Sequence, residues 1–420
     1  MYDVVVVGAR VAGSSTAMLL ARRGLRVLAA DRATFPSDTM STHQVQIPGI
    51  AKLKEWGLLD GVIASNAPPT RHVRFVTPVA RLEGNYPSLD GVDAMFSPRR
   101  TVLDAMLIDA AREAGAEVRE NFIVDEILLD GGRVVGIRGA EKGGRTVEER
   151  ARLVVGADGK HSMVAKAVRA EAYREKPALS LASYTYWAGV PVEGGEIHAL
   201  PRRAVGAWPT NDGLLLTYIA WPIEEFESFR RNIEGNVLAT LDLTGDLGER
   251  VRAGRRVERI RTTPDVPNVF RKPFGPGWAL VGDAGLVMDP ITGQGIGDAL
   301  RDAEQLANAA QAGLIDGESL EAAMAEYQRK RDEARLPMYE FTTDLASFRP
   351  TRPEEELLFR ALVGKQEDID RFFGVMAGVV PIKEYMNPKN LMKILGFRGM
   401  AKAVLSKMRG GRPKPGRAAA

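Results

Sequence analysis

Residues 2–13 read YDVVVVGARVAG, and this stretch decides the fold. The run Val4–Val7 is β-branched and continuous, which is typical of a buried parallel strand. Small residues then form a turn, residues 14–23 are good helix formers, and residues 26–30 predict a second strand that ends at Asp31. The stretch therefore opens a βαβ unit of about thirty residues.

This βαβ unit has the features of a nucleotide site. A pyrophosphate is favoured at the helix N-terminus by free N–H groups and the helix dipole. Asp31 follows Gly8 by 23 positions and is placed to accept hydrogen bonds from a ribose. Arg10 replaces the usual middle glycine, which hinders close backbone approach, although its side chain can still reach the phosphates. A glycine turn without a ligand is the alternative.

Two later motifs repeat the pattern of a strand followed by a glycine-rich turn. Residues 154–164 read VVGADGKHSMV, with Asp158-Gly159 in the turn. Residues 278–284 read WALVGDA and place Asp283 at the carboxyl end of a buried strand. Residues 289–297 read DPITGQGIG and present bare N–H groups at a helix start, which suits an electron-rich group.

The composition excludes several classes of protein. The 420 residues are 45% hydrophobic and 26% charged, as in a soluble globular protein. The absence of cysteine excludes disulfides, thiolate metal sites and a cysteine nucleophile, and it fits a cytoplasmic protein. The four histidines form no metal-binding pattern, and no signal peptide or membrane-spanning run is expected. The last twenty residues hold six Lys and Arg; the other residues have 51 basic and 54 acidic side chains, so no nucleic-acid partner is expected.

Taken together, the three motifs resemble the FAD-dependent class A flavoprotein monooxygenase superfamily, which has the para-hydroxybenzoate hydroxylase fold. Relatives include flavin-dependent halogenases and geranylgeranyl reductases. The resemblance implies an α/β fold: a Rossmann-type FAD-binding domain of the glutathione reductase type, an inserted antiparallel β-sheet domain for substrate, and C-terminal helices. The expected divisions are an FAD-binding domain (1–70, 95–180 and 263–330), a substrate domain (71–94 and 181–262), a helical region (331–408) and a flexible basic tail (409–420).

The resemblance also implies roles for individual residues. Those expected to hold FAD are Gly8, Arg10, Val11, Ala12, Gly13, Asp31, Arg32, Arg100, Val124, Asp158, Gly282, Asp283, Gly295 and Ile296. The backbone of Pro290, Gly293 and Gly295 is expected beside the reactive flavin ring. His43 is read as a flavin contact or a covalent histidyl link, with a hydrogen-bonded loop histidine as the alternative. Ala165 stands where the family often has arginine, which weakens the expectation of NAD(P)H as co-substrate.

The insertion at residues 180–262 is aromatic-rich, turn-rich and strand-like, which predicts an antiparallel sheet domain. Its aromatic side chains are expected to form a substrate wall: Tyr184, Tyr186, Trp187, Trp208, Tyr218 and Trp221. Alternate residues of a strand share a face, so Tyr184 and Tyr186 point one way and Trp187 the other. The alternative is that most of them are sheet core. An apolar or aromatic small-molecule substrate follows as a hypothesis.

The function implied by the resemblance is an FAD-dependent monooxygenase. It would use NAD(P)H and O2 to hydroxylate or epoxidise its substrate through a C4a-(hydro)peroxyflavin. Halogenases have a Trp-x-Trp-x-Ile-Pro segment, and residues 186–191 lack the second tryptophan. Isoprenoid reductases have Tyr-x-Trp-x-Phe-Pro, and residues 218–222 have the wrong spacing. A reductase of isoprenoid C=C bonds, a halogenase and a non-catalytic FAD-binding protein remain as alternatives.

The C-terminal stretch 391–408 is basic and partly amphipathic. It is interpreted either as a weak contact with an anionic membrane surface or as a helix packed on the body with a frayed tail. The sequence indicates no oligomeric state.

Overall fold

Strand β1 (Tyr2–Val7) lies in the middle of the first sheet, as its β-branched run predicts. In this computed structural model, which describes residues 1–410, β1 pairs in parallel with β2 (Val27–Ala30) and β8 (Val147–Gly156). Strand β18 (Trp278–Leu280) adds in parallel to β8, and β5 (Glu117–Arg119) to β2. The parallel order is β18-β8-β1-β2-β5, and the predicted Rossmann-type α/β fold is confirmed.

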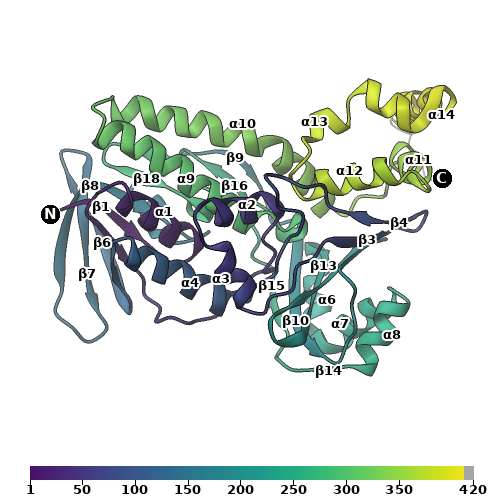
Figure 1. Ribbon diagram of the computed structural model, residues 1–420, viewed down its shortest axis with the longest axis horizontal. Helices are drawn as coiled ribbons and strands as arrows, with labels where there is room; N and C mark the ends of the chain where they lie inside the picture. Colours follow the sequence, from purple (N-terminus) through teal and green to yellow (C-terminus); the bar gives the residue numbers. More distant parts are fainter. Residues whose placement is uncertain (411–420) are drawn as a thin grey trace, which may run out of the picture.

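The two faces of this sheet carry different layers. Val4 and Val6 pack on a helical layer, and Val5 and Val7 pack on a second layer of strands. Burying each such side chain stabilises the fold by roughly 1.5–3 kcal/mol. The helical layer contains α1 (Val11–Ala21), α4 (Arg100–Glu113) and α9 (Gly295–Leu314), and the antiparallel layer contains β6 (Phe122–Asp130) and β7 (Arg133–Glu141) (Figure 1).

A second sheet is built mainly from the insertion. Its order is β14-β10-β13-β12-β11-β3-β4, with β15 beside β10. Its strands are β3 (His72–Val76), β4 (Arg81–Asn85), β10 (Ser180–Ala188), β11 (Gly195–Leu200), β12 (Arg203–Thr210), β13 (Leu214–Pro222), β14 (Arg255–Arg256) and β15 (Arg261–Thr263). All pairs are antiparallel except β11 with β3.

The insertion was expected to form an antiparallel sheet, and that expectation was wrong for residues 226–253. This part forms the helices α6 (Phe226–Arg231), α7 (Ile233–Asp242) and α8 (Asp246–Ala253), which cover one face of the second sheet. Ile233, Val237 and Leu241 recur every four residues, which is the period of a helix face. The alternation of residues 94–97 also predicts a strand, but these residues form only isolated bridges, Thr70 with Met95 and Val45 with Phe96.

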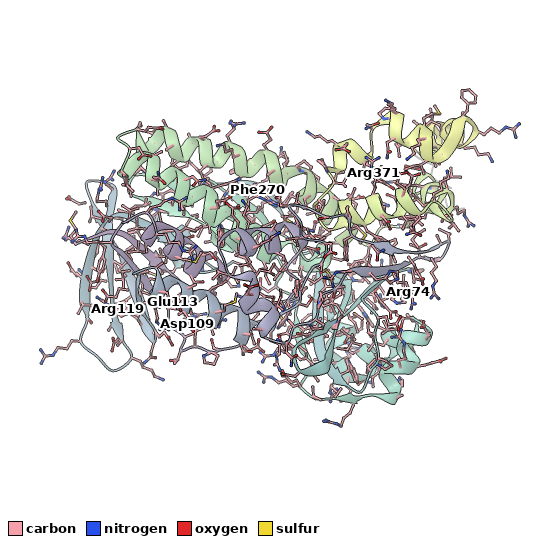
Figure 2. All side chains as sticks on the ribbon, viewed as in Figure 1. Arg74, Asp109, Glu113, Arg119, Phe270 and Arg371 are labelled. Carbon is pink, nitrogen blue, oxygen red and sulfur yellow. The ribbon has the colours of Figure 1, made fainter. Side chains whose placement is uncertain are left out.

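Smaller elements complete the region between the sheets. A third sheet has the order β19-β16-β9. Phe270 of β16, labelled in Figure 2, is buried and packs against Tyr339. The remaining elements before the C-terminal region are α2 (Ile47–Glu55), α3 (Leu59–Ala64), α5 (Met163–Ala167), β9 (Ala172–Lys176), β16 (Asn268–Arg271), β17 (Phe274–Gly275) and β19 (Leu286–Val287).

The C-terminal region is helical, as expected. Its helices are α10 (Leu320–Ala346), α11 (Pro353–Leu362), α12 (Gln366–Met376), α13 (Ile382–Tyr385) and α14 (Pro388–Gly410). Helix α10 packs along α9, and α11–α14 lie beyond its end, above β3 and β4 (Figure 1). The expected division after residue 330 falls inside α10, and most of the expected basic tail, residues 411–420, lies outside the described residues. None of the described helices is long and apolar enough to cross a bilayer.

Candidate active site

The three glycine-rich motifs and Asp31 meet at the carboxyl ends of the parallel strands, which form one edge of the first sheet. In the register of this sheet, Val7 is level with Ala30 of β2 and with Gly156 of β8, and Gly156 is level with Leu280 of β18. The turns that follow these strands therefore start side by side. Ligands of open parallel sheets bind outside the carboxyl ends of the strands, so this edge is where a nucleotide is expected.

The first turn has no room for side chains. Gly8 has a φ of +98°, and a Cβ placed on it would lie 2.5 Å from the carbonyl oxygen of Ala157. A Cβ on Gly13 would lie 1.8 Å from the carbonyl oxygen of Gly8. Helix α1 has no side-chain cap and no acid in its first turn, so the N–H groups of Val11 and Ala12 are open to an anion.

Asp31 is nearly buried and fixes this turn. One carboxylate oxygen accepts the N–H of Ala9 at 2.7 Å, and the other accepts the N–H of Ala33 at 2.8 Å. Each oxygen has a second lone pair, so the carboxylate can still accept hydrogen bonds from a ribose. Arg32 beside it is exposed, and Val124 lies half-buried on β6.

Arg10 does not lie free beside the turn. Its guanidinium donates to Asp104 Oδ2 at 2.6 Å and to Ser37 Oγ at 2.9 Å. Arg100 holds the same carboxylate through two bonds of 2.9 and 3.1 Å. The buried Asp104 thus joins α1 to α4, and the triad keeps one net positive charge where a pyrophosphate would bind. Sequence reasoning missed the role of Asp104, although its spacing of four residues from Arg100 places both on one helix face.

The acids of the second and third motifs face the same edge. Asp158 Oδ2 caps the N–H of Met163 at 2.6 Å, while its Oδ1 is buried with no partner among the described residues. Asp283 is exposed to solvent, yet protein surrounds it closely enough that burial raises the pKa of its carboxyl, against the charges of Arg100 and Lys160.

The turn before α9 is open on one side. Gly293 has a φ of +63°, and a Cβ on it would lie 2.1 Å from Gln44 Oε1. Gly295 is exposed with no heavy atom within 4 Å of an added Cβ, and α9 has no side-chain cap. The N–H groups at Gly295 and Ile296 are therefore available to an electron-rich ligand. Pro290 follows the buried Asp289, which accepts a 2.6 Å hydrogen bond from Ser180 at the start of β10.

His43 is buried between this turn and the second sheet. It has a φ of +62°; its Nδ1 lies 2.8 Å from the Ser41 carbonyl, and its Nε2 lies 2.7 Å from Tyr186 Oη. Burial lowers the pKa of His43 to about 4, so the ring is neutral. In that state Nδ1–H donates to Ser41 and the Tyr186 hydroxyl donates to Nε2. Both ring nitrogens are engaged in hydrogen bonds, and the three interpretations of His43, as a flavin contact, a covalent link or a loop histidine, stay predictions.

The predicted aromatic residues divide between the two faces of the second sheet. Tyr184, Tyr186, Trp208 and Tyr218 lie on the face toward His43 and the first sheet. Trp208 Nε1 donates to the Thr42 carbonyl at 3.0 Å, on the same loop as His43.

Trp187 and Trp221 lie on the opposite face, against α6–α8. Their indole N–H groups donate to Thr217 and Thr240, each at 2.9 Å. The structure thus separates these two residues from the other four, as the alternation of strand residues predicts.

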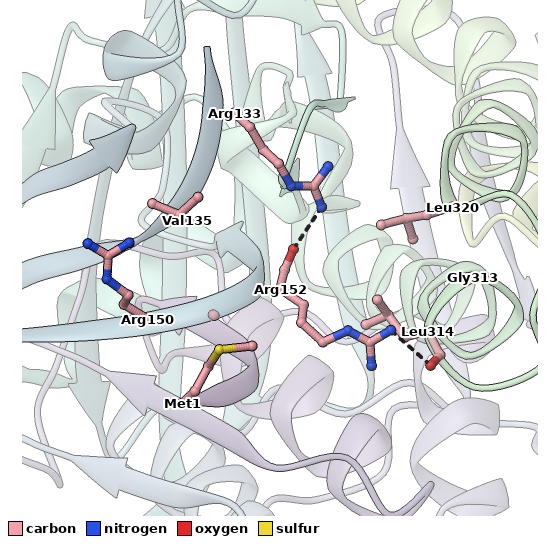
Figure 3. Close-up of a pocket in the computed structure, with 9 residues that line it drawn as sticks. Met1, Arg133, Val135, Arg150, Arg152, Gly313, Leu314 and Leu320 are labelled. Carbon is pink, nitrogen blue, oxygen red and sulfur yellow. Dashed lines mark hydrogen bonds between the residues drawn. The ribbon is translucent and has the colours of Figure 1, made fainter. Parts of the chain in front are cut away.

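A hollow of about 460 Å³ lies elsewhere, near Met1 and the C-terminal end of α9 (Figure 3). Arg133, Arg150 and Arg152 line it, and Arg152 donates to the Leu314 carbonyl at 3.3 Å. Helix α9 has 20 residues, so this hollow lies roughly 30 Å from the turn at Gly295. It is too distant to take part in chemistry there.

The comparisons with known proteins agree with this geometry. Residues 1–342 match the family described as FAD binding domain. The chain belongs to this family. It is 29% identical over 389 residues to digeranylgeranylglycerophospholipid reductase 1 of Methanopyrus kandleri, which covers 90% of this chain and 99% of that protein.

Two solved flavoproteins share the fold. The flavin-dependent brominase Bmp2 superposes with a TM-score of 0.79 at 18% identity, covering 97% of this chain and 98% of that one. PqsL of Pseudomonas aeruginosa, described as a probable FAD-dependent monooxygenase, gives 0.65 at 22% identity, covering 89% and 99%. The resemblance to the flavoprotein superfamily that includes monooxygenases, halogenases and geranylgeranyl reductases is confirmed.

The residues present fit FAD. The turn at Gly8 and Gly13 is a cradle that any Cβ would fill, and the unpartnered Asp158 Oδ1 lies at the same edge. The residues at the start of α1, with Arg100 beside them, would hold the pyrophosphate, and Asp31 would accept hydrogen bonds from the ribose. Gln44 and Gln294, which shape the α9 turn, were not predicted, because neither lies in a recognisable motif.

Proposed function

We propose that this FAD-binding oxidoreductase is a monooxygenase that uses NAD(P)H and O2 to hydroxylate or epoxidise an apolar or aromatic small molecule. One observation carries the proposal: the open start of α9 and the aromatic face of the second sheet are joined by a single loop. In that loop Gln44 contacts the α9 turn at Gly293, and His43 contacts Tyr184 and Tyr186.

Three features of the chain suit the region between the start of α9 and the aromatic face of the second sheet to this reaction. When bound, FAD supplies the redox chemistry. The N–H groups at Gly295 and Ile296 donate to electron-rich atoms on one side, and aromatic side chains keep water away on the other. His43 and Tyr186 are both neutral, because burial lowers the pKa of His43 and raises the pKa of Tyr186. The neutral aromatic side chains favour an apolar substrate, and the Arg99 guanidinium, 4.6 Å from the centre of the Tyr186 ring, adds one positive charge beside them.

Reduction of an isoprenoid C=C bond is a second candidate. The relative from Methanopyrus kandleri supports it, since the match extends over almost the full length of both chains. The segment at residues 218–222 lacks the spacing of the reductase motif, which favours the monooxygenase. The halogenase is less favoured because residues 186–191 lack the second tryptophan.

The test is to mix the FAD-loaded protein with NADPH or NADH without air and then to admit ¹⁸O2 with a panel of aromatic and isoprenoid compounds. The monooxygenase predicts flavin bleaching, O2 consumption and one ¹⁸O atom in the product. A product that gains two hydrogens without O2 consumption identifies the reductase. Bromide- or chloride-dependent halogenation identifies the halogenase, and flavin that binds but is never reduced identifies a non-catalytic protein.

A further inference from the structure

Helix α14 divides at Gly396 into a packed half and an unpacked half. Gly396 has φ 65° and ψ 173°, which no α-helical residue adopts. Before it, Ile394 is buried and its carbonyl accepts a 2.5 Å hydrogen bond from Lys365, while Lys393 pairs with Asp368 at 2.9 Å. After it, none of residues 397–406 is buried. In Figure 1 this half lies at the end of the molecule away from the N-terminus.

The unpacked half exposes one continuous apolar face. Its apolar residues recur at the spacing of a single helix face: Phe397, Met400, Ala401, Val404 and Leu405. Together with Met392 they line a hollow of about 360 Å³. Phe397 is 80% exposed and Leu405 is 53% exposed. A contiguous apolar patch of this kind marks an interaction surface, because water covers it at a free-energy cost.

The charge of this segment selects the partner. Residues 388–420 contain no Asp or Glu and nine basic residues: Lys389, Lys393, Arg398, Lys402, Lys407, Arg409, Arg412, Lys414 and Arg417. Arg398 and Lys402 are exposed beside the apolar face. A second copy of the chain packed on this face would bring like charges together, whereas a bilayer with anionic headgroups complements them.

We propose that residues 397–410 dock on the surface of an anionic lipid bilayer, with the Phe397 face in the headgroup region and the exposed Arg398 and Lys402 against the lipid phosphates. The segment is about 21 Å long, shorter than the roughly 30 Å hydrocarbon core, so it lies in the plane of the interface. This proposal goes beyond the proposed function and does not depend on it.

Co-sedimentation of the full-length protein with vesicles tests the proposal. Vesicles of phosphatidylglycerol and phosphatidylcholine are compared with pure phosphatidylcholine, at low salt and at ~0.5 M salt. We expect at least about tenfold tighter binding to the anionic vesicles at low salt and its loss at high salt. Leu405→Ser and the pair Arg398→Gln with Lys402→Gln should each weaken binding, whereas Leu129→Ser, equally exposed but on β6, should not.

Circular dichroism melts confirm that the variants fold. Equal binding to neutral vesicles, or binding unchanged in both α14 variants, overturns the proposal. So does a dimer in light scattering that Leu405→Ser dissociates while vesicles are not bound, because the face would then join two copies. Failure of the full-length protein to bind anionic vesicles at low salt overturns it directly.

Discussion

At Gly8, two effects of an added methyl group can be separated. Gly8→Ala places a Cβ 2.5 Å from the Ala157 carbonyl oxygen at a φ of +98°, whereas Gly24→Ala adds the same group at +83° with nothing within 4 Å. Both substitutions carry the left-handed penalty of roughly 1–2 kcal/mol. Only Gly8→Ala should also displace the turn that receives the pyrophosphate, raising the Kd of FAD by about tenfold or more. Flavin fluorescence titration measures this, and equal Kd values in the two variants would contradict it.

Asp289 should make the stability of the protein depend on pH, and the direction follows from the shift of its pKa. Burial raises its pKa to about 6, with hydrogen bonds from Ser180 and Ile291 acting against the shift. The folded protein therefore favours the protonated carboxyl of Asp289. The stability that comes from this preference is fully present below the unfolded pKa of about 3.9 and is lost as the pH rises through 6. Relative to Asp289→Asn, the unfolding free energy of the unchanged protein should fall by on the order of 3 kcal/mol from pH 4 to pH 7. Urea unfolding at several pH values measures this; a flat difference contradicts it.

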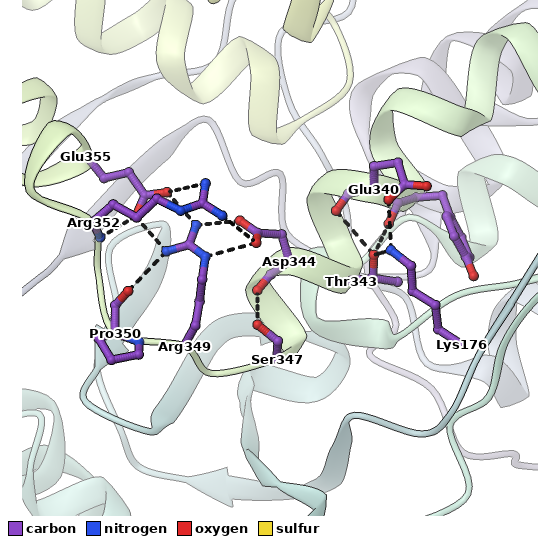
Figure 4. A network of polar contacts seen from close by, with 10 residues as sticks. Lys176, Glu340, Thr343, Asp344, Ser347, Arg349, Pro350, Arg352 and Glu355 are labelled. Carbon is purple, nitrogen blue, oxygen red and sulfur yellow. Dashed lines mark hydrogen bonds and ion pairs between the residues drawn. The ribbon is translucent and has the colours of Figure 1, made fainter. Parts of the chain in front are cut away.

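Among the elements, α10 and α11 are joined mainly by Arg349, with a longer bond of 3.2 Å from Arg352 to Asp344. Arg349 donates to Asp344 at the end of α10 and to Glu355 at the start of α11, each at 2.9 Å (Figure 4). Because these groups are only partly buried, Arg349→Met should cost about 1 kcal/mol. Protease cleavage between residues 346 and 353 should become faster, as the junction opens locally. Arg329→Met, which removes exposed pairs within α10, is the control and should leave cleavage unchanged.

Elements with a strong local pattern could be predicted from the sequence, and contacts between distant segments could not. The β-branched run of β1, the turn at Gly8 and the strand end before Asp283 depend on local rules of backbone and burial. Helices α6–α8 were not predicted, because the aromatic content of the insertion favoured strands. The apolar residues that recur every four positions in this part, which indicate a helix, were given less weight. The Arg10–Asp104 pair and the Tyr186–His43 hydrogen bond join residues 94 and 143 positions apart, so only the folded chain brings them together.

Across the whole molecule, the proposed FAD site exists only when the fold is complete. Its residues come from segments as distant as Gly8 and Gly295, so the unfolded chain has no such site. A ligand that binds only the folded state adds about 2.7 kcal/mol of stability at about 100 times its Kd. The thermal midpoint should therefore rise by several degrees with FAD and less with riboflavin, which lacks the pyrophosphate and the ribose that Asp31 receives. Differential scanning fluorimetry with both compounds measures this. Equal shifts, or an undiminished FAD shift in Gly8→Ala, would show that the nucleotide half of FAD does not bind at the start of α1.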